Sequence, residues 1–137
     1  MNLSEHINTK TDRVLCPHCG GGALMLTQTG IIDMFEELRA YLNNKYDQPI
    51  ALKINSGYRC FAYNEDLKRR GYPASRKSLH LKGVAFDIAP IGITPSTLVK
   101  DCQKLWKDKN ILTGGLGLYA WGVHIDTGKH RTWDYRK

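Results

Sequence analysis

The spacing of hydrophobic and polar residues divides most of the chain into helices and strands. Apolar residues recur every three or four positions from Ile31 to Tyr46, which predicts an amphipathic helix with Thr29 as its N-cap. A second helical run follows Thr94-Pro95, which combines a capping residue with a favoured first helical proline. The apolar stripe of this second helix includes two residues that we expect to be buried, Cys102 and Trp106.

Four shorter segments have the pattern of strands. Residues 50–55 alternate apolar and polar side chains, and residues 83–88 are rich in small and apolar ones. Residues 117–119 and 123–126 predict two antiparallel strands with a short connection after a turn at Gly114-Gly115. The chain has no repeat, low-complexity segment or linker, so we expect one α+β domain with a small, mostly antiparallel sheet and flanking helices.

Two segments near the middle of the chain are expected to lie outside the sheet. Tyr58–Arg70 predicts a short helix that Gly71 and Pro73 would stop. Ala74–Leu79 predicts a basic loop that leads into the next strand.

The first 28 residues are organised differently from the rest. Residues 1–13 are polar and aperiodic, so we expect a loose terminus there. Cys16-Pro17-His18-Cys19 is followed by three glycines, which predicts a tight turn. We therefore divide the chain into an N-terminal segment (residues 1–28) and a main domain (residues 29–137) that together form one globular unit.

The Cys16/Cys19 pair has the spacing of a zinc knuckle. A structural zinc needs four ligands, and the sequence offers no second close pair. His6 or His18 could contribute, or Cys60 if the fold brings it near. We expect a turn that holds the N-terminal segment against the main domain, and no second metal ion.

The composition excludes some classes of protein. The 137 residues suit a single domain with its own core, and no apolar run approaches the roughly 20 residues that span a bilayer. The polar N-terminus does not have the pattern of a secretory signal. The net charge of +7 would attract polyanions, but the basic residues are scattered and form no long arm, so we expect no nucleic-acid partner.

A histidine and an aspartate lie seven positions apart around small residues. His80 and Asp87 can reach one metal ion only if the chain curls between them. Gly83 and Ala85 leave room for such a close approach, which bulkier side chains would block.

A second such pair follows on the last predicted strand. With His124, the first pair would form a set of two imidazoles and one carboxylate with an open fourth position, as at hydrolytic zinc sites, where zinc lowers the pKa of bound water to about 7. Asp126 points to the same face of its strand and could orient a ligand, act as general base or accept a proton from the leaving amine. The alternative is that these residues are satisfied polar groups of an ordinary α+β core.

The motif Ser78-x-His80-x-x-Gly83-x-Ala85-x-Asp87, with the later His124-x-Asp126, resembles the zinc D-alanyl-D-alanine carboxypeptidase family. That family includes phage L-alanyl-D-glutamate endopeptidases and shares a fold with hedgehog signalling domains. The resemblance covers about residues 29–135 and extends to other segments, namely Asn55-Ser56-Gly57-Tyr58-Arg59-Cys60, Asn64, Arg131 and Trp133. It implies a hedgehog/DD-peptidase-like fold.

The resemblance also implies a zinc-dependent peptidase, either a carboxypeptidase or an endolysin-type endopeptidase, that acts on peptidoglycan stem peptides. One catalytic zinc ion would be bound by His80, Asp87 and His124. A guanidinium is always charged and offers a planar fork of donors, so Arg59 would bind or polarise the substrate. The residues that contact or support the substrate would be Arg59, Ser78 and Trp121.

One position departs from the family pattern. Several branches place an acidic general base three residues before the last histidine, where this chain has Trp121. Either Asp126 takes that role or catalysis is altered, so the first alternative is a zinc-containing cell-wall binding module without activity. A second alternative, a nucleic-acid-binding zinc protein built on Cys16 and Cys19, would bind DNA with a steep salt dependence.

Within this resemblance, the size, the basic charge and the polar N-terminus would suit a phage or prophage lysis enzyme. We expect a monomer that is made in the cytoplasm, does not insert into the membrane, and reaches the cell wall after release by a holin.

Overall fold

Alternating side chains give the main sheet one apolar face and one polar face. The computed structural model describes residues 2–72, 78–111 and 114–136. Its main sheet has the strand order β3-β4-β6-β5-β7, and neighbouring strands are antiparallel except for the parallel pair β5–β7. The strands are β3 (Ala51–Ser56), β4 (Ala85–Ile91), β5 (Gly115–Leu118), β6 (Val123–Asp126) and β7 (Arg131–Asp134).

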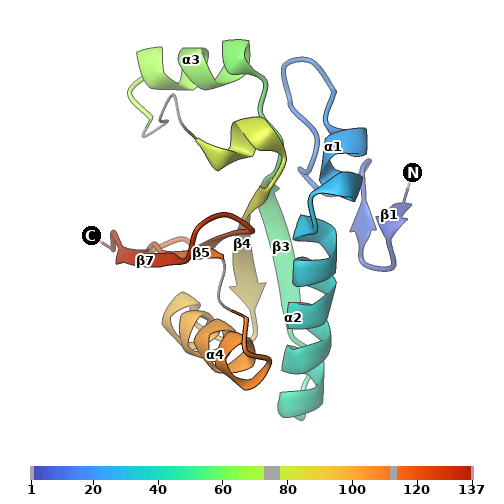
Figure 1. Ribbon diagram of the computed structural model, residues 1–137, viewed down its shortest axis with the longest axis vertical. Coiled ribbons are helices and arrows are strands. Elements are labelled where there is room, and N and C mark those ends of the chain that lie inside the picture. The colour runs from blue at the N-terminus through green and yellow to red at the C-terminus, as the bar shows by residue number, and fades with distance from the viewer. Residues whose placement is uncertain (1, 73–77, 112–113, 137) are drawn as a thin grey trace.

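Two long helices cover the apolar face. α2 (Ile31–Lys45) runs beside β3, and α4 (Pro95–Asp108) lies near the far end of β4 (Figure 1). Both helices were predicted, and Thr94 caps α4 by accepting a hydrogen bond from the N–H of Thr97. The expected cap of α2 is wrong. Gly30 occupies that position, while the Thr29 hydroxyl donates to the Gly83 carbonyl at 2.6 Å.

The hydrophobic core lies between these helices and the sheet. The Phe35 ring of α2 meets the Phe86 ring of β4 edge-on, with ring centroids 5.8 Å apart. Cys102 and Trp106 of α4 are buried, as predicted. Because side chains alternate along a strand, burial of Phe86 toward the helices turns its neighbour Asp87 to the opposite face.

The N-terminal segment is ordered, which corrects the expectation of a loose terminus. β1 (Asn2–Ser4) and β2 (Ile7–Asn8) pair antiparallel. Ile7 and Val14 are fully buried, and the Val14 carbonyl accepts a hydrogen bond from the N–H of Tyr58. A short helix that the sequence pattern did not indicate, α1 (Ala23–Gln28), follows the glycines.

The helical segments between β3 and β4 lie at one end of the main sheet (Figure 1). α3 (Phe61–Arg69) begins three residues later than expected, after Cys60 as its N-cap. The 3-10 helix η1 (Leu79–Lys82) precedes β4, and residues 74–77 of the predicted basic loop lie outside the described residues. β5 includes Gly115, where a turn was predicted, and β7 was not predicted at all.

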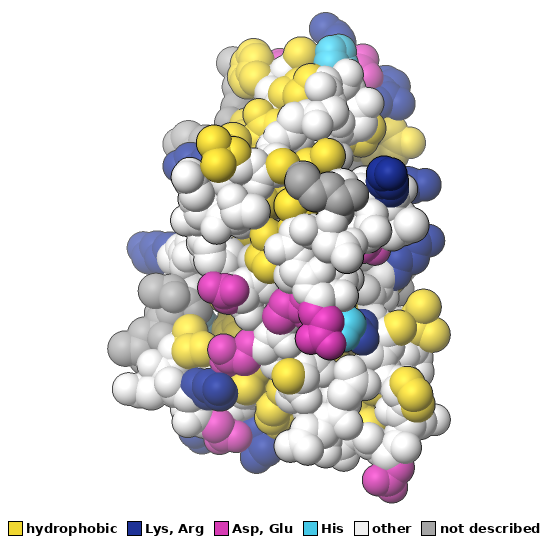
Figure 2. All heavy atoms as spheres, turned by 90° about the vertical axis from the view of Figure 1, so that its right-hand side faces the viewer, with side chains coloured by type: hydrophobic (Ala, Val, Ile, Leu, Met, Phe, Trp, Pro, Cys, Tyr) yellow, Lys and Arg dark blue, Asp and Glu magenta, His cyan; other side chains and the backbone are white. Residues whose placement is uncertain are grey.

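The outer surface has mixed charge. On the face that Figure 2 turns toward the viewer, acidic side chains lie across the middle and basic side chains lie mainly along the edges. This face therefore carries no broad basic stripe of the kind that binds nucleic acid. Across the described part of the chain, no helix combines the length and apolar character needed to cross a bilayer.

A buried carboxylate joins the two long helices and gives a test of the fold. Asp101 of α4 is 2% exposed and accepts hydrogen bonds from Lys45 Nζ and Tyr46 Oη, both at 2.6 Å. We expect Asp101→Ala to lower the free energy of unfolding by about 2 kcal/mol, because both contacts are lost. Urea denaturation measures this loss, and Asp108→Ala, at an exposed position of the same helix, is the matched control. Equal stability of the two variants would contradict the assignment.

Candidate functional site

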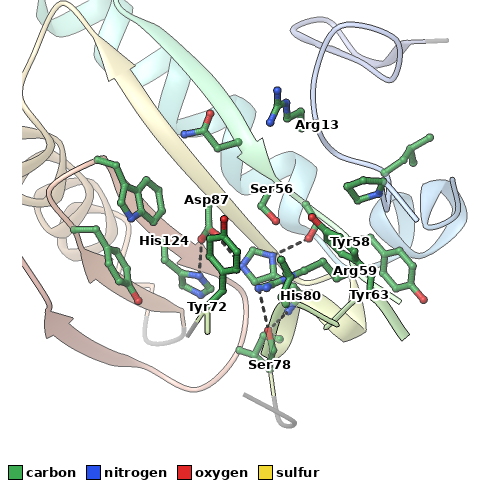
Figure 3. Close-up of a pocket in the computed structure, with 18 of the residues that line it drawn as sticks. Arg13, Ser56, Tyr58, Arg59, Tyr63, Tyr72, Ser78, His80, Asp87 and His124 are labelled. Carbon is green, nitrogen blue, oxygen red and sulfur yellow. Dashed lines mark hydrogen bonds and ion pairs between the residues drawn. The ribbon is translucent and has the colours of Figure 1, made fainter. Parts of the chain in front are cut away.

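A pocket of about 550 Å³ opens on the polar face of the sheet. Strands β4 and β6, helix η1 and the segment that leads into α3 all contribute to its wall. Figure 3 shows His124, Asp87 and His80 side by side in this pocket, with Arg59 beyond His80. The residues that the sequence singled out are thus brought together from separate parts of the chain.

Three potential metal ligands converge there. One side-chain ligand atom from each of His80, Asp87 and His124 lies within 4.8 Å of the other two. Asp87 and His124 are directly opposite each other in the β4–β6 register. The Asp87 carboxylate lies between the imidazoles, with Oδ2 3.2 Å from His80 Nε2 and Oδ1 3.0 Å from His124 Nδ1.

The backbone fixes the orientation of His80. Its Nδ1 lies 2.7 Å from the Gly57 carbonyl, which can only accept a hydrogen bond, so Nδ1 carries the proton. The other ring nitrogen, Nε2, then faces Asp87 and the pocket. This side chain is buried, and its position follows from the turn at Gly83, whose φ of 66° ends η1 and lets the chain curl back into β4. The curl predicted between His80 and Asp87 is therefore confirmed.

A second carboxylate fixes the orientation of His124. Asp126 Oδ2 lies 2.8 Å from His124 Nε2, which leaves Nδ1 facing Asp87. Burial alone would lower the pKa of His124, but the hydrogen bonds with Asp126 and Asp87 outweigh it and raise the pKa. In its neutral form, each imidazole can therefore present one unprotonated nitrogen to the pocket while a protein acceptor holds the proton on the other, which is the arrangement that metal-ligating histidines have in proteins.

Asp126 itself is enclosed. It is fully buried, and its Oδ1 accepts hydrogen bonds from the N–H groups of Gly115 and Gly128 at 2.8 and 2.9 Å. Arg131 Nη2 lies 3.1 Å from Oδ2. Burial alone would raise the pKa of Asp126, but the hydrogen bonds with His124 and with Gly115 and Gly128 lower it to about 2. Of the three roles considered from the sequence, this geometry favours the orientation of His124.

Two glycines of β5 make room for this arrangement. A Cβ added at Gly115 would collide with the carboxylate of Asp126, and one added at Gly117 would collide with the ring of Trp133. Gly115 and Gly117 are paired with Arg131 and Trp133 of β7. Larger residues on this face of β5 would displace the side chains that surround His124.

The electrostatics of Asp87 also suit a cation. Burial alone would raise the pKa of Asp87, but the neighbouring His80 and His124 hold it well below its usual range. The carboxylate is therefore ionised at neutral pH. Two imidazole nitrogens and an ionised carboxylate are the donor set expected at a catalytic zinc site.

Arg59 has an unused donor beside these residues. Its backbone N–H donates to the His80 carbonyl at 3.1 Å, and its Nη2 donates to the Ser78 hydroxyl at 3.4 Å. Its Nε is buried and has no hydrogen-bond partner among the described residues. The Ser78 hydroxyl in turn accepts from the His80 N–H at 3.3 Å, so Ser78 caps η1 as well as contacting Arg59.

Aromatic side chains form another part of the pocket wall. The rings of Tyr119 and Trp121 stack with centroids 4.9 Å apart, and Trp121 is 46% exposed. Trp133 packs against His124 and donates from Nε1 to the Tyr119 hydroxyl at 2.9 Å. Trp121 and Trp133 both line the pocket, whereas His130 is exposed outside it.

Sequence reasoning missed other residues that line the pocket. Arg13, in the segment expected to be loose, lines the pocket, as do Tyr63, Tyr72 and Tyr119. The apolar pair Val14-Leu15 was the available signal that this segment packs against the domain. Nothing in the local pattern of Tyr72 or Tyr119 indicated a place in the pocket.

Cys60 lies next to the Cys16/Cys19 turn. The Cys60 N–H donates to Cys16 Sγ at 3.4 Å, and the three sulfurs form a group at the junction with the N-terminal segment. The expectation of a simple turn is thus incomplete, because the fold brings Cys60 to the pair.

Comparison with known proteins identifies the family. A family profile described as "Peptidoglycan L,D-endopeptidase MepK" matches residues 26–133. The curated protein of that name from Escherichia coli K12 is 34% identical over 106 residues, which are 76% of this chain and 53% of the relative. The probable peptidoglycan L,D-endopeptidase MepK of Haemophilus influenzae is 31% identical over 84 residues, which are 60% of this chain and 42% of that protein.

The chain thus spans about half the length of the curated relatives it matches. No solved structure matches it significantly. The profile match covers most of the chain, so the chain belongs to this family of M15 peptidases, and the α+β fold with a mostly antiparallel sheet is consistent with that family.

The enclosed Asp126 predicts a pH-dependent contribution to stability. A carboxylate whose pKa falls from about 4 to about 2 on folding stabilises the protein above pH 4, and this contribution is lost as the pH falls through 2. In metal-free protein, we expect Asp126→Asn to lower the free energy of unfolding by about 2 kcal/mol at pH 7 and by progressively less between pH 4 and pH 2. Urea unfolding across this range measures the difference.

The matched control is Asp134→Asn. Asp134 is exposed and pairs with Arg136 at 2.8 Å on the surface, where such pairs contribute little. A pH-independent deficit in Asp126→Asn, or an equal deficit in the control, would contradict the role given to Asp126.

Proposed function

We propose that this chain is a zinc-dependent peptidase that hydrolyses peptide bonds in the stem peptides of peptidoglycan. The relatives are named peptidoglycan L,D-endopeptidases. We extend that bond class, between an L- and a D-configured residue, to this chain. These names favour an endopeptidase over the carboxypeptidase that the sequence left open.

One observation carries the proposal. The ligand atoms of His80, Asp87 and His124 converge in a pocket, beside a buried guanidinium nitrogen of Arg59 that has no partner among the described residues. A satisfied polar core, the alternative considered from the sequence, would leave neither an open pocket nor an unused donor at this point.

The donor set fits zinc. His80 would bind through Nε2 and His124 through Nδ1, because Gly57 and Asp126 hold the protons on the other ring nitrogens. Asp87 would supply the carboxylate oxygen. A zinc ion at this site would act as a Lewis acid that activates water for attack on the peptide carbonyl.

Arg59 would bind the substrate. The Arg59 side chain donates a hydrogen bond to Ser78, and the Arg59 backbone N–H donates to the His80 carbonyl. The guanidinium therefore has a defined position relative to the three ligands. It can pair with a stem-peptide carboxylate or polarise the scissile carbonyl. Arg13, on the wall formed by the N-terminal segment, adds a second positive charge for an acidic peptide.

Aromatic side chains would hold the peptide over these groups. Trp121 is half exposed and stacked on Tyr119, which gives it a rigid apolar face toward the pocket. This face can cover the aliphatic part of a stem peptide and exclude water from it. Trp121 would thus contact the substrate at the position where other branches carry an acid.

Asp126 is proposed as a positioning residue. It is buried, it accepts several hydrogen bonds, and it is absent from the lining of the pocket. It would keep the proton of His124 on Nε2 and so keep Nδ1 available to the metal. The proton of the attacking water would then have to pass to another group.

This geometry also favours the second candidate, a zinc-containing binding module of the cell wall without activity. Trp121 cannot accept a proton, and the Asp126 carboxylate is sealed from the pocket by its donors. Such a module would bind metal and stem peptide and release no product.

The proposed site of action is the cell wall. The relatives' names refer to peptidoglycan, and a basic protein is attracted to anionic wall polymers. Action as a monomeric phage or prophage lysis enzyme released by a holin remains part of this proposal.

Digestion of defined peptidoglycan tests the function. We expect the protein to release new amine termini at L,D-linkages, with complete loss of cleavage after chelation and recovery on adding Zn²⁺. His80→Ala should abolish cleavage, because it removes a ligand, whereas His130→Ala should retain it. Mass spectrometry of the fragments identifies the bond. Metal-loaded protein that binds stem peptide but releases no termini would establish the binding module instead.

A change at Arg59 separates binding from folding. We expect Arg59→Ala to reduce kcat/KM by about 10- to 100-fold, because a charge-assisted hydrogen bond to the substrate is lost. Arg69→Ala is the matched control, since Arg69 lies exposed on α3 and pairs with Asp66. Steady-state kinetics on a soluble stem peptide provide the measurement. An unchanged kcat/KM with unchanged zinc content would remove Arg59 from the substrate site.

A further inference from the structure

Three cysteine sulfurs meet where the N-terminal segment joins the main domain. The Sγ atoms of Cys16, Cys19 and Cys60 lie within 4.8 Å of one another. Thiolates bound to one zinc ion at about 2.3 Å in a tetrahedron are about 3.8 Å apart. Small side-chain movements would therefore place all three sulfurs around one ion. The fourth cysteine, Cys102, is buried in α4 and does not belong to this group.

Backbone N–H groups point at each of these sulfurs. Cys16 Sγ accepts from the Cys60 N–H, Cys19 Sγ from the Gly21 N–H, and Cys60 Sγ from the Tyr63 N–H, each at 3.4 Å. The last of these contacts also places Cys60 at the N-terminus of α3, where the helix dipole favours a negative charge. Such donors stabilise the thiolate, which is the form that binds metal.

The three sulfurs lie close enough together for their charges to interact. Three thiolates at this spacing repel one another strongly in the absence of a cation. A bound divalent ion removes this conflict and uses all three sulfurs.

We propose that Cys16, Cys19 and Cys60 bind a second Zn²⁺ ion, with a water molecule as the fourth ligand. Among the described residues, no further His, Cys, Asp or Glu offers a ligand atom within the same distance of all three sulfurs. Cys19 is exposed, so the fourth position faces solvent.

This ion would join two segments that line the pocket. Cys60 is adjacent to Arg59, and Gly57 three positions earlier accepts the hydrogen bond that orients His80. On the other side of the junction, Val14 is tied to Tyr58, and Arg13 lines the pocket. Zinc bound to Cys16 and Cys60 would fix these two segments to each other and so hold both arginines in place.

A disulfide is the competing outcome. Any two of the sulfurs would have to approach to about 2.05 Å, and the third would be left as a free thiol. A disulfide would need no metal and would be broken by reductant. The two possibilities therefore differ in metal content and in the number of free thiols.

Metal analysis of purified, reduced protein separates the two sites. We expect about two zinc ions per chain in the natural sequence and about one in the His80→Ala/Asp87→Ala variant, which retains the cysteine site. The Cys19→Ser variant should also bind about one ion fewer, and because Cys19 is exposed, this substitution leaves the packing of the core unchanged. Cys102→Ala is the matched control, and His18→Ala tests the fourth ligand. Both should retain two ions.

Replacement of zinc by Co²⁺ gives a readout that is independent of activity. Cobalt bound to thiolates shows an intense sulfur-to-metal charge-transfer absorption, which the histidine and aspartate set cannot produce. We expect this absorption in the natural sequence and in His80→Ala/Asp87→Ala, and its loss in Cys19→Ser. This result holds whether or not the protein cleaves peptidoglycan.

Three results would overturn the proposal. The first is one zinc ion per chain and no charge-transfer absorption in the natural sequence. The second is a disulfide among the three cysteines, found by alkylation and mass spectrometry, that persists in place of metal. The third is a loss of zinc in His18→Ala, which would exclude water as the fourth ligand.

Discussion

The two-residue alternation of the sheet is the constraint on which the site depends. Phe86 and Ile125 face the helices, so their strand neighbours Asp87, His124 and Asp126 must face the other way. A shift of one residue in register would bury the polar set against α2 and α4 and expose the core. The free energy that burial of Phe86 and Ile125 contributes to folding therefore also fixes the positions of the candidate ligands.

A chain of close polar contacts then sets which atoms of these residues face the pocket. It runs from the Gly57 carbonyl through His80, Asp87 and His124 to Asp126. At each end a protein acceptor determines which ring nitrogen carries the proton, so the two remaining nitrogens and Asp87 face one another. Buried polar groups are costly when one partner is missing, which ties the stability of this region to the integrity of the site. The enclosed state of Asp126 follows from the same chain, since an acceptor that holds His124 this firmly has little freedom to move protons.

Much of this arrangement could be predicted from the sequence. The elements and contacts that could not be predicted have physical reasons in common. The helices at Ile31 and Pro95 follow from local periodicity, and the curl at Gly83 follows from the short separation of His80 and Asp87. Elements that depend on contacts between distant segments have no such signal in the local sequence. β7 depends on its pairing with β5, and the ordered N-terminal segment depends on Val14 binding to Tyr58. Thr29 is a good capping residue by type, but its hydroxyl instead donates to the distant carbonyl of Gly83.

The N-terminal segment forms part of the pocket wall. The family profile begins at residue 26, yet Arg13 lines the pocket and Cys16 contacts Cys60 beside Arg59. Gly57 has no room for a Cβ because the backbone of Val14 packs against it, and the same Gly57 orients His80. Gly57 thus contacts both the N-terminal segment and His80, so a shift of that segment would change the orientation of a candidate metal ligand. This wall of the pocket therefore lies outside residues 26–133, the part of the chain that the family profile matches.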